Sequence, residues 1–127
     1  MKALLIEDTL TSATLVSHQL RKIGIEPIVA RNGETGIELY QQERPDLILL
    51  DIIMPGMDGF EVARRIRQLE QFGEWTPIIF LTARTSDADL ERAISVGGDD
   101  YLIKPVSGTV LAAKVRAMQR IAQMRFS

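Results

Sequence analysis

The chain has 127 residues, of which 46% are hydrophobic and 25% charged, and its formal net charge is -2. This composition is typical of one globular domain and excludes a disordered or fibrous protein. The chain has no cysteine and a single histidine, which excludes disulfides, thiolate metal sites and histidine clusters. With this net charge the chain has no broad basic surface, so we do not expect it to bind nucleic acid directly. Any metal site must therefore use oxygen ligands.

The amino terminus has none of the features of a signal peptide. Met1 and Lys2 lead into a short apolar stretch that ends at Glu7 and Asp8, which makes the stretch too short and too acidic for that role. No apolar run approaches the roughly 20 residues that span a bilayer. We therefore expect a cytoplasmic protein that does not bind membranes.

Five short apolar segments alternate with five segments of helical period. The expected strands are residues 3–6, 26–30, 47–50, 78–81 and 101–103, and the expected helices are residues 11–23, 33–43, 59–72, 87–96 and 108–124. Strands that are apolar throughout belong to a parallel sheet covered on both faces. The pattern predicts an α/β fold, a five-stranded parallel, doubly wound (βα)5 sheet with the flavodoxin-like strand order 2-1-3-4-5.

Polar or charged residues follow four of the five expected strands, whereas the second strand ends in nothing comparable. They are Glu7 and Asp8 after the first strand, Asp51 after the third, Thr82 after the fourth and Lys104 after the fifth. Ala83 follows Thr82 and Pro105 follows Lys104. Ligands of a doubly wound sheet bind outside the carboxyl ends of its strands. These residues are therefore expected to form one site.

The three carboxylates of this group predict a metal site. A pair of carboxylates 4 Å apart repels by roughly 4 kcal/mol at an effective dielectric constant of 20, and a divalent cation relieves this repulsion. Oxygen ligands alone select magnesium, manganese or calcium. We expect Asp8 and Asp51 to bind magnesium directly, with manganese as the alternative, and Glu7 to bind through a metal-bound water. From the sequence alone Glu7 and Asp8 could exchange roles.

The same group of residues suits phosphoryl chemistry. An aspartate can act as a nucleophile toward phosphorus, and phosphoryl transfer asks a protein mainly for positioning and charge neutralisation. Lys104 and the hydroxyl of Thr82 supply a cation and a hydrogen-bond donor on the other side of Asp51. Asp58, ahead of Gly59 and a helical run, is instead predicted to be a helix N-cap.

Taken together, these motifs resemble the receiver domain of two-component response regulators over essentially the whole chain. The resemblance rests on Glu7 and Asp8, on Asp51, on residues 54–59, on Thr82 and Ala83, and on residues 98–105. We therefore interpret residues 1–127 as a single receiver domain. The resemblance implies a signalling switch that accepts a phosphoryl group on Asp51 from a sensor histidine kinase or a histidine phosphotransfer protein. Such a switch catalyses its own phosphorylation and dephosphorylation but is not a turnover enzyme.

The resemblance also implies roles for single residues. Asp8, Asp51 and the backbone carbonyl of Ile53 would hold magnesium with the help of Glu7. Lys104 would pair with the phosphate. Thr82 and Tyr101 would form the switch, in which the hydroxyl moves to the phosphate and the ring turns inward.

Four further residues follow from the resemblance or lie beside its motifs. Small Ala83 would leave room for the phosphoryl group, and Arg84 would modulate water access to it. The bond between Lys104 and Pro105 is expected to be cis. Gly59 is expected to let the loop after Asp51 turn sharply.

The fourth helix, the fifth strand and the fifth helix would form the output face, through which a homodimer could also form. The last helix, residues 108–124, carries more apolar surface than one sheet covers. It is either an ordinary packed helix with a frayed end or a helix that leads to an output domain or a dimer partner. Residues 110–121 look more like receivers fused to signalling enzymes, such as diguanylate cyclases, than like those fused to DNA-binding domains. We therefore expect the native protein to extend beyond Ser127.

Three other functions are alternatives to this interpretation. A flavodoxin-type FMN-binding electron carrier needs a glycine-containing phosphate cradle after the first strand, where this chain has threonines but no glycine. An aspartate-nucleophile phosphohydrolase commonly has a second acid two residues after the first, where this chain has Ile53. A degenerate receiver that is never phosphorylated would not need Asp51, Asp8, Thr82 and Lys104 together.

Overall fold

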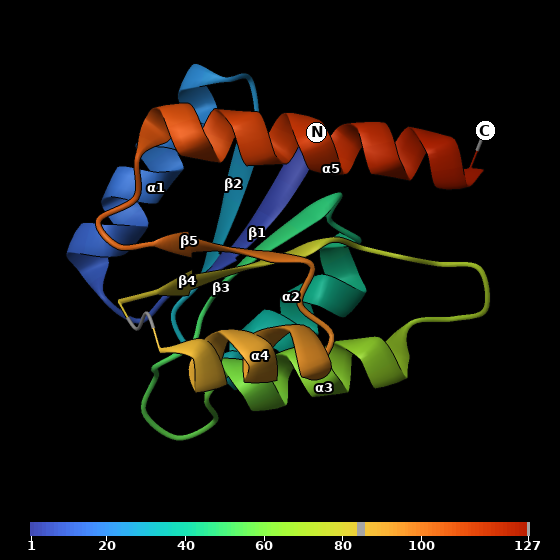
Figure 1. Cartoon of the computed structure of the whole chain (residues 1–127), viewed down its shortest axis with the longest axis horizontal. Helices are drawn as coiled ribbons and strands as arrows, with labels where there is room; N and C mark the ends of the chain where they lie inside the picture. Colours follow the sequence, from blue (N-terminus) through green and yellow to red (C-terminus); the bar gives the residue numbers. More distant parts are fainter. Residues whose placement is uncertain (84–85, 127) are drawn as a thin grey trace.

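The computed structural model describes residues 1–83 and 86–126, and in this part of the chain five strands alternate with five helices (Figure 1). The strands are β1 (Lys2–Ile6), β2 (Glu26–Ala30), β3 (Leu47–Asp51), β4 (Ile78–Thr82) and β5 (Asp100–Ile103). The helices are α1 (Leu10–Lys22), α2 (Gly33–Glu43), α3 (Gly59–Leu69), α4 (Asp87–Ser95) and α5 (Gly108–Phe126).

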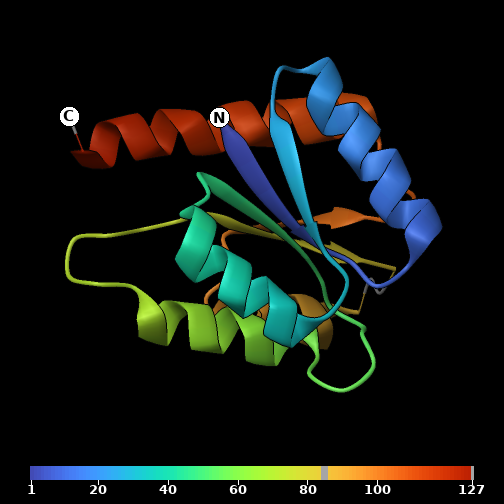
Figure 2. The ribbon, with the colours of Figure 1, turned by 180° about the vertical axis from the view of Figure 1, so that it is seen from behind.

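The strands form one parallel sheet in the order β2-β1-β3-β4-β5. Helices α1 and α5 cover one face of the sheet, and α2, α3 and α4 cover the other, as the two opposite views show (Figures 1 and 2). The predicted fold class and strand order are confirmed. The carboxyl ends of β1, β3 and β4 therefore meet at one edge, as the site requires.

Alternate residues of β1, β3 and β4 belong to two separate hydrophobic clusters. Leu5, Leu49 and Leu81 pack with α1 and α5, whereas Ile48 and Phe80 pack with α2, α3 and α4. All five side chains are fully buried. Because both faces of these three central strands bury apolar residues, each of them reads as a nearly continuous apolar run in the sequence.

Helix α3 is shorter than the sequence predicts, because it ends at Leu69 rather than at Phe72. Glu70 follows with extended backbone, at ψ 134°. Its carboxylate contacts Arg67 and accepts a hydrogen bond from the backbone N–H of Thr76 (3.1 Å), which turns the chain away from the helix axis. Phe72 is fully exposed, so a longer helix would gain no packing there. The other predicted boundaries differ from the structure by at most two residues, within the ordinary uncertainty of helix and strand ends.

Helix α5 runs to Phe126, two residues beyond its predicted end. Its carboxyl-terminal part and the loop after α3 project toward the same end of the molecule (Figures 1 and 2). Ile121 and Met124 in this part of the helix are exposed. Within the described residues, no helix combines the length and the apolar character that crossing a bilayer requires.

Two glycines shape the loop that follows Asp51, with different physical reasons. Gly56 has a φ of +76°, which favours glycine, so the sharp turn lies there and not at Gly59 as expected. Gly59 is needed because α3 begins against the backbone of β3: a Cβ at this position would lie 2.2 Å from the carbonyl oxygen of Asp51. The start of α3 thus fixes the backbone of the residue that carries the central carboxylate.

We expect Gly59→Ala to lower the free energy of unfolding by about 2–3 kcal/mol, because the backbone of β3 cannot yield to the added methyl group. Gly108→Ala is the matched control, since its Cβ would meet only side-chain atoms of Gln19 at 3.6 Å or more. That variant should stay within about 1 kcal/mol of the parent or gain stability. Urea denaturation of both variants checks the prediction, and equal effects would contradict it.

Candidate functional site

The predicted site residues converge at the carboxyl edge of the sheet. Asp51 and Thr82 are the last residues of β3 and β4, and Glu7 and Lys104 directly follow β1 and β5. Glu7, Asp51 and Thr82 are buried, with 0%, 5% and 1% of their surface exposed. Buried carboxylates are costly unless they are paired, so the site needs a counter-charge.

Lys104 supplies this charge. Its Nζ lies 2.8 Å from Oε2 of Glu7 and 3.1 Å from Oδ2 of Asp51. The backbone N–H of Lys104 donates to the carbonyl oxygen of Thr82 (2.9 Å), so the ladder between β4 and β5 positions the residue. The bond from Lys104 to Pro105 is cis, as the resemblance implies.

Three acidic side chains form a group that could hold a cation. Carboxylate oxygens of Glu7, Asp8 and Asp51 all lie within 4.8 Å of one another. Oδ1 of Asp8 is buried and accepts no hydrogen bond from the residues that the structure describes. A buried carboxylate oxygen without a donor, in an all-oxygen group, fits a hard divalent cation such as magnesium.

The surroundings of Asp51 disfavour its charged form. Burial raises its pKa first and the nearby charge of Glu7 raises it further, while Lys104 opposes both, and the result is a pKa of about 7. For Lys104, burial alone would lower the pKa. Its hydrogen bond to Glu7 and the charges of Asp51 and Glu7 outweigh burial, so the pKa of Lys104 rises above its ordinary value. The lysine is therefore charged at neutral pH, while Asp51 lacks enough positive charge to be fully ionised.

Thr82 and Tyr101 lie on the face of the sheet that α2, α3 and α4 cover. Thr82 shares its strand face with Phe80, and Tyr101 packs half-buried against the same cluster as Phe80. Ile103, the register partner of Thr82, is 41% exposed. The structure thus brings Thr82 and Tyr101 to the same side of neighbouring strands, which is the arrangement a paired movement requires.

Four predicted residues remain, namely Ile53, Ala83, Arg84 and Asp58. Ile53 is exposed in the loop after β3, and Ala83 is exposed directly after Thr82. Arg84 lies outside the described residues. Asp58 is confirmed as the N-cap of α3, because its Oδ1 accepts a hydrogen bond from the backbone N–H of Glu61 (2.9 Å).

The sequence did not predict the contacts of two cations, Arg31 at the carboxyl edge of the sheet and Lys114 beside the start of β5. The expectation that β2 ends in nothing comparable was wrong, because the guanidinium of Arg31 donates to the backbone carbonyl of Asp8 (2.6 Å). Its position directly after β2 could have indicated this. Lys114 of α5 lies 2.9 Å from Oδ1 of Asp100 and donates to the carbonyl oxygen of Tyr101. No local pattern marks Lys114, since only the fold brings α5 beside β5.

The family model described as the response regulator receiver domain matches residues 3–116. A transcriptional regulatory protein of Streptomyces coelicolor, AfsQ1, is 47% identical over 117 residues, which cover 92% of this chain and 50% of that protein. The chain therefore spans about half the length of this curated relative.

Solved structures of other proteins are also similar to this chain. The chemotaxis protein CheY4 of Vibrio cholerae has a TM-score of 0.86 and 32% identity, with 92% of this chain and 97% of that chain covered. The BeF3-activated receiver domain of RstA from Klebsiella pneumoniae has a TM-score of 0.85 and 33% identity, with 94% and 99% covered. The chain belongs to the receiver domains of two-component response regulators. The flavodoxin and phosphohydrolase alternatives are not favoured.

The raised pKa of Asp51 predicts a pH-dependent stability difference. Since the folded state binds the proton more tightly than the unfolded state, the contribution of Asp51 to stability is lost as the pH rises toward about 7. In urea denaturation without divalent cations, Asp51→Asn should be more stable than the parent at a pH of about 8. The difference should shrink by up to about 2 kcal/mol at a pH of about 5.5. A difference that does not change with pH would contradict this explanation.

Proposed function

We propose that this receiver accepts a phosphoryl group on Asp51 in a magnesium-dependent reaction. The donor is the phosphohistidine of a sensor histidine kinase or a histidine phosphotransfer protein. The observation that carries the proposal is the position of Asp51, which is buried between the acidic group of Glu7 and Asp8 and the ammonium of Lys104. A strand-end carboxylate with a cation site on one side and a fixed lysine on the other suits phosphoryl transfer.

Each residue has a distinct task in this reaction. An oxygen of Asp51 forms the new bond to phosphorus while the phosphorus–nitrogen bond of the donor breaks. Lys104, already held at the site by β5, pairs with the phosphoryl oxygens. Asp8, Asp51 and the backbone carbonyl of Ile53 would hold magnesium, with Glu7 acting through a water. The bound cation would keep Asp51 ionised and neutralise phosphoryl charge.

The phosphoryl group then changes the balance of charges around Thr82 and Tyr101. The hydroxyl of Thr82 would donate to a phosphoryl oxygen, and the ring of Tyr101 would turn toward the space that this movement opens. Ala83 would leave room for the phosphoryl group, and Arg84 would modulate the access of water to it. Each of these roles is a proposal carried by the family membership and by the positions of Thr82, Ala83 and Tyr101.

The output face is proposed to consist of α4, β5 and α5. Its exposed apolar side chains include Ile94, Ile103 and Val110. The exposed carboxylates Asp87 and Glu91 lie on α4, while α5 carries four basic residues and no acidic one. A second copy related by a two-fold axis would place unlike charges opposite each other, so a homodimer is the association that this face favours.

An output domain beyond Ser127 is a further proposal. The length of AfsQ1, of which this chain covers half, supports a longer native protein. The residues of the last helix favour a signalling enzyme such as a diguanylate cyclase, whereas the name of AfsQ1 favours a transcriptional effector. In either case α5, which projects past the sheet, would form the connection.

Incubation with acetyl phosphate and magnesium, followed by intact mass measurement, tests the phosphoacceptor directly. We expect one phosphoryl adduct, its loss in Asp51→Asn, and its suppression by a chelator. Asp46→Asn is the matched control, because Asp46 is exposed at the opposite end of the same strand and should leave the adduct unchanged. An equal adduct in Asp51→Asn, or its loss only in Asp46→Asn, would refute the assignment.

Sedimentation equilibrium with and without beryllofluoride and magnesium tests the output face. We expect association of the parent to strengthen with beryllofluoride, and Ile103→Glu to weaken it at least about tenfold by placing a charge in an apolar contact. Val29→Glu is the control, because Val29 is similarly exposed, at 39%, on the opposite edge strand. If both variants weaken association equally, or neither does, the proposed face is wrong.

A further inference from the structure

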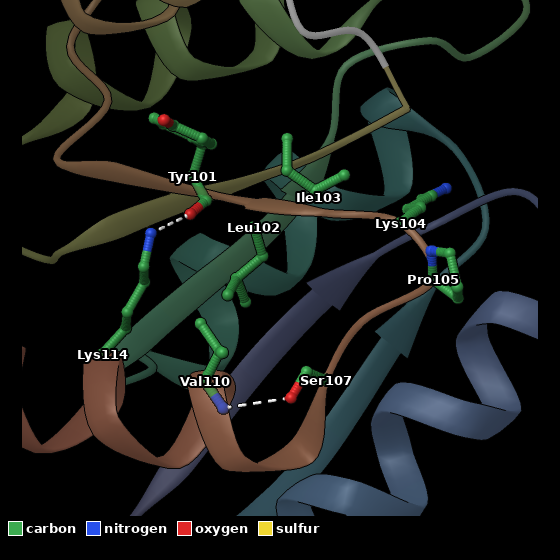
Figure 3. Close-up of a pocket in the computed structure, with 8 residues that line it drawn as sticks. All are labelled: Tyr101, Leu102, Ile103, Lys104, Pro105, Ser107, Val110 and Lys114. Carbon is green, nitrogen blue, oxygen red and sulfur yellow. Dashed lines mark hydrogen bonds between the residues drawn. The ribbon is translucent and has the colours of Figure 1, made fainter.

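Lys114 reaches the free edge of the sheet beside the switch tyrosine. Strand β5 is the last in the sheet order, so one side of its backbone has no neighbouring strand. The Nζ of Lys114 donates to the carbonyl oxygen of Tyr101 (Figure 3). It also lies 2.9 Å from Oδ1 of Asp100. The same Nζ lies 4.7 Å from the centroid of the Tyr101 ring. One ammonium therefore contacts the carboxylate, the backbone and the ring of two adjacent residues.

These three contacts differ in what they depend on. The carbonyl oxygen of Tyr101 and the carboxylate of Asp100 stay in place when the tyrosine side chain rotates. They hold the ammonium at the strand edge, where the lysine also covers a backbone acceptor that an edge strand leaves unpaired. The contact with the ring exists only while the ring lies near the edge, because cation–π attraction requires a distance within about 6 Å of the centroid.

The packing around the ring of Tyr101 does not fix its position, so the contact with Lys114 matters. Tyr101 is only half-buried, and a pocket of about 340 Å³ between β5 and α5 is lined by Tyr101, Lys114, Ile103 and Val110, among others (Figure 3). Tyr101 and Ile103 point to the same side of β5, whereas Leu102 points to the core (Figure 3). A half-buried ring beside a pocket is not fixed by packing alone, so a single charged contact can bias its position.

We propose that Lys114 is a positioning residue that holds the ring of Tyr101 at the free edge of β5 and thereby couples α5 to the switch. The inference rests on the proposed function of Asp51 and Tyr101. A contact made in only one of two ring positions shifts the equilibrium toward that position. Lys114 therefore opposes the inward movement of the ring, and removing the lysine should favour the phosphorylated state.

The composition of the chain allows a direct test by fluorine NMR. Its two tyrosines are Tyr40 and Tyr101, and Tyr40 is 2% exposed on α2. In protein labelled with 3-fluorotyrosine, Tyr101 reports the switch and Tyr40 reports that the fold is intact. Tyr101→Phe assigns the signals, and beryllofluoride with magnesium defines the shift of the activated state.

We expect Lys114→Met to move the Tyr101 signal toward its beryllofluoride position in the absence of the ligand, with the Tyr40 signal unchanged. The affinity for beryllofluoride should rise by about 2- to 5-fold, the size expected for the loss of one cation–π contact. Lys114→Arg should restore the parent behaviour. Arg116→Met, which removes an exposed cation from the same helix, should have no effect on the Tyr101 signal.

Two outcomes would overturn the inference in distinguishable ways. If beryllofluoride moves the Tyr101 signal of the parent while Lys114→Met changes neither the signal nor the affinity, Lys114 does not position the ring and the proposed function stands. If beryllofluoride fails to move the Tyr101 signal of the parent, the proposed switch fails and the coupling to α5 fails with it.

Discussion

The ion pairs of Lys104 with Glu7 and Asp51 are the interaction on which this site depends. Both carboxylates are buried at the edge of the sheet, and Lys104 lies within 3.1 Å of each. Removing Lys104 would leave two buried carboxylates without compensation, at a cost of several kcal/mol. One ammonium cannot neutralise two carboxylates and the nearby Asp8, so the site keeps an excess of negative charge in the folded protein. Cation binding and phosphorylation would both act on this imbalance.

Strand β5 connects this imbalance to the surface of the molecule. It carries Lys104 at its end and Tyr101 three residues earlier, and its ladder with β4 joins the backbone of Lys104 to that of Thr82. The charge cluster lies beside β3, whereas Tyr101 packs on the side of α3 and α4. Under the proposed function, a change at Asp51 would reach both faces of the sheet through this one short strand. This strand pairs with β4 on one side, and Lys114 contacts its backbone on the other side, which suits β5 to a shift between two arrangements.

The elements that the sequence predicted well are those governed by local patterns. Continuous apolar strands fixed the sheet type, and the convergence of Glu7, Asp51 and Lys104 follows from parallel strands sharing one carboxyl edge. The residues that were missed act across long sequence separations. Lys114 reaches Asp100 only because the fold brings α5 beside β5, whereas the position of Arg31 directly after β2 could have indicated its approach to Asp8. The same limit applies to the end of α3 and to Gly59, whose requirement comes from the backbone of β3 rather than from its own turn.

The pKa of Asp51, measured by carbon-13 NMR of its carboxyl group, tests the central claim most directly. In the absence of divalent cations the account requires a pKa of about 7, because burial and Glu7 outweigh the stabilisation by Lys104. Magnesium at a saturating concentration should then lower this pKa by at least about 2 units, since a bound cation favours the charged carboxylate. A carboxyl group that titrates at its ordinary value and does not respond to magnesium would contradict the account.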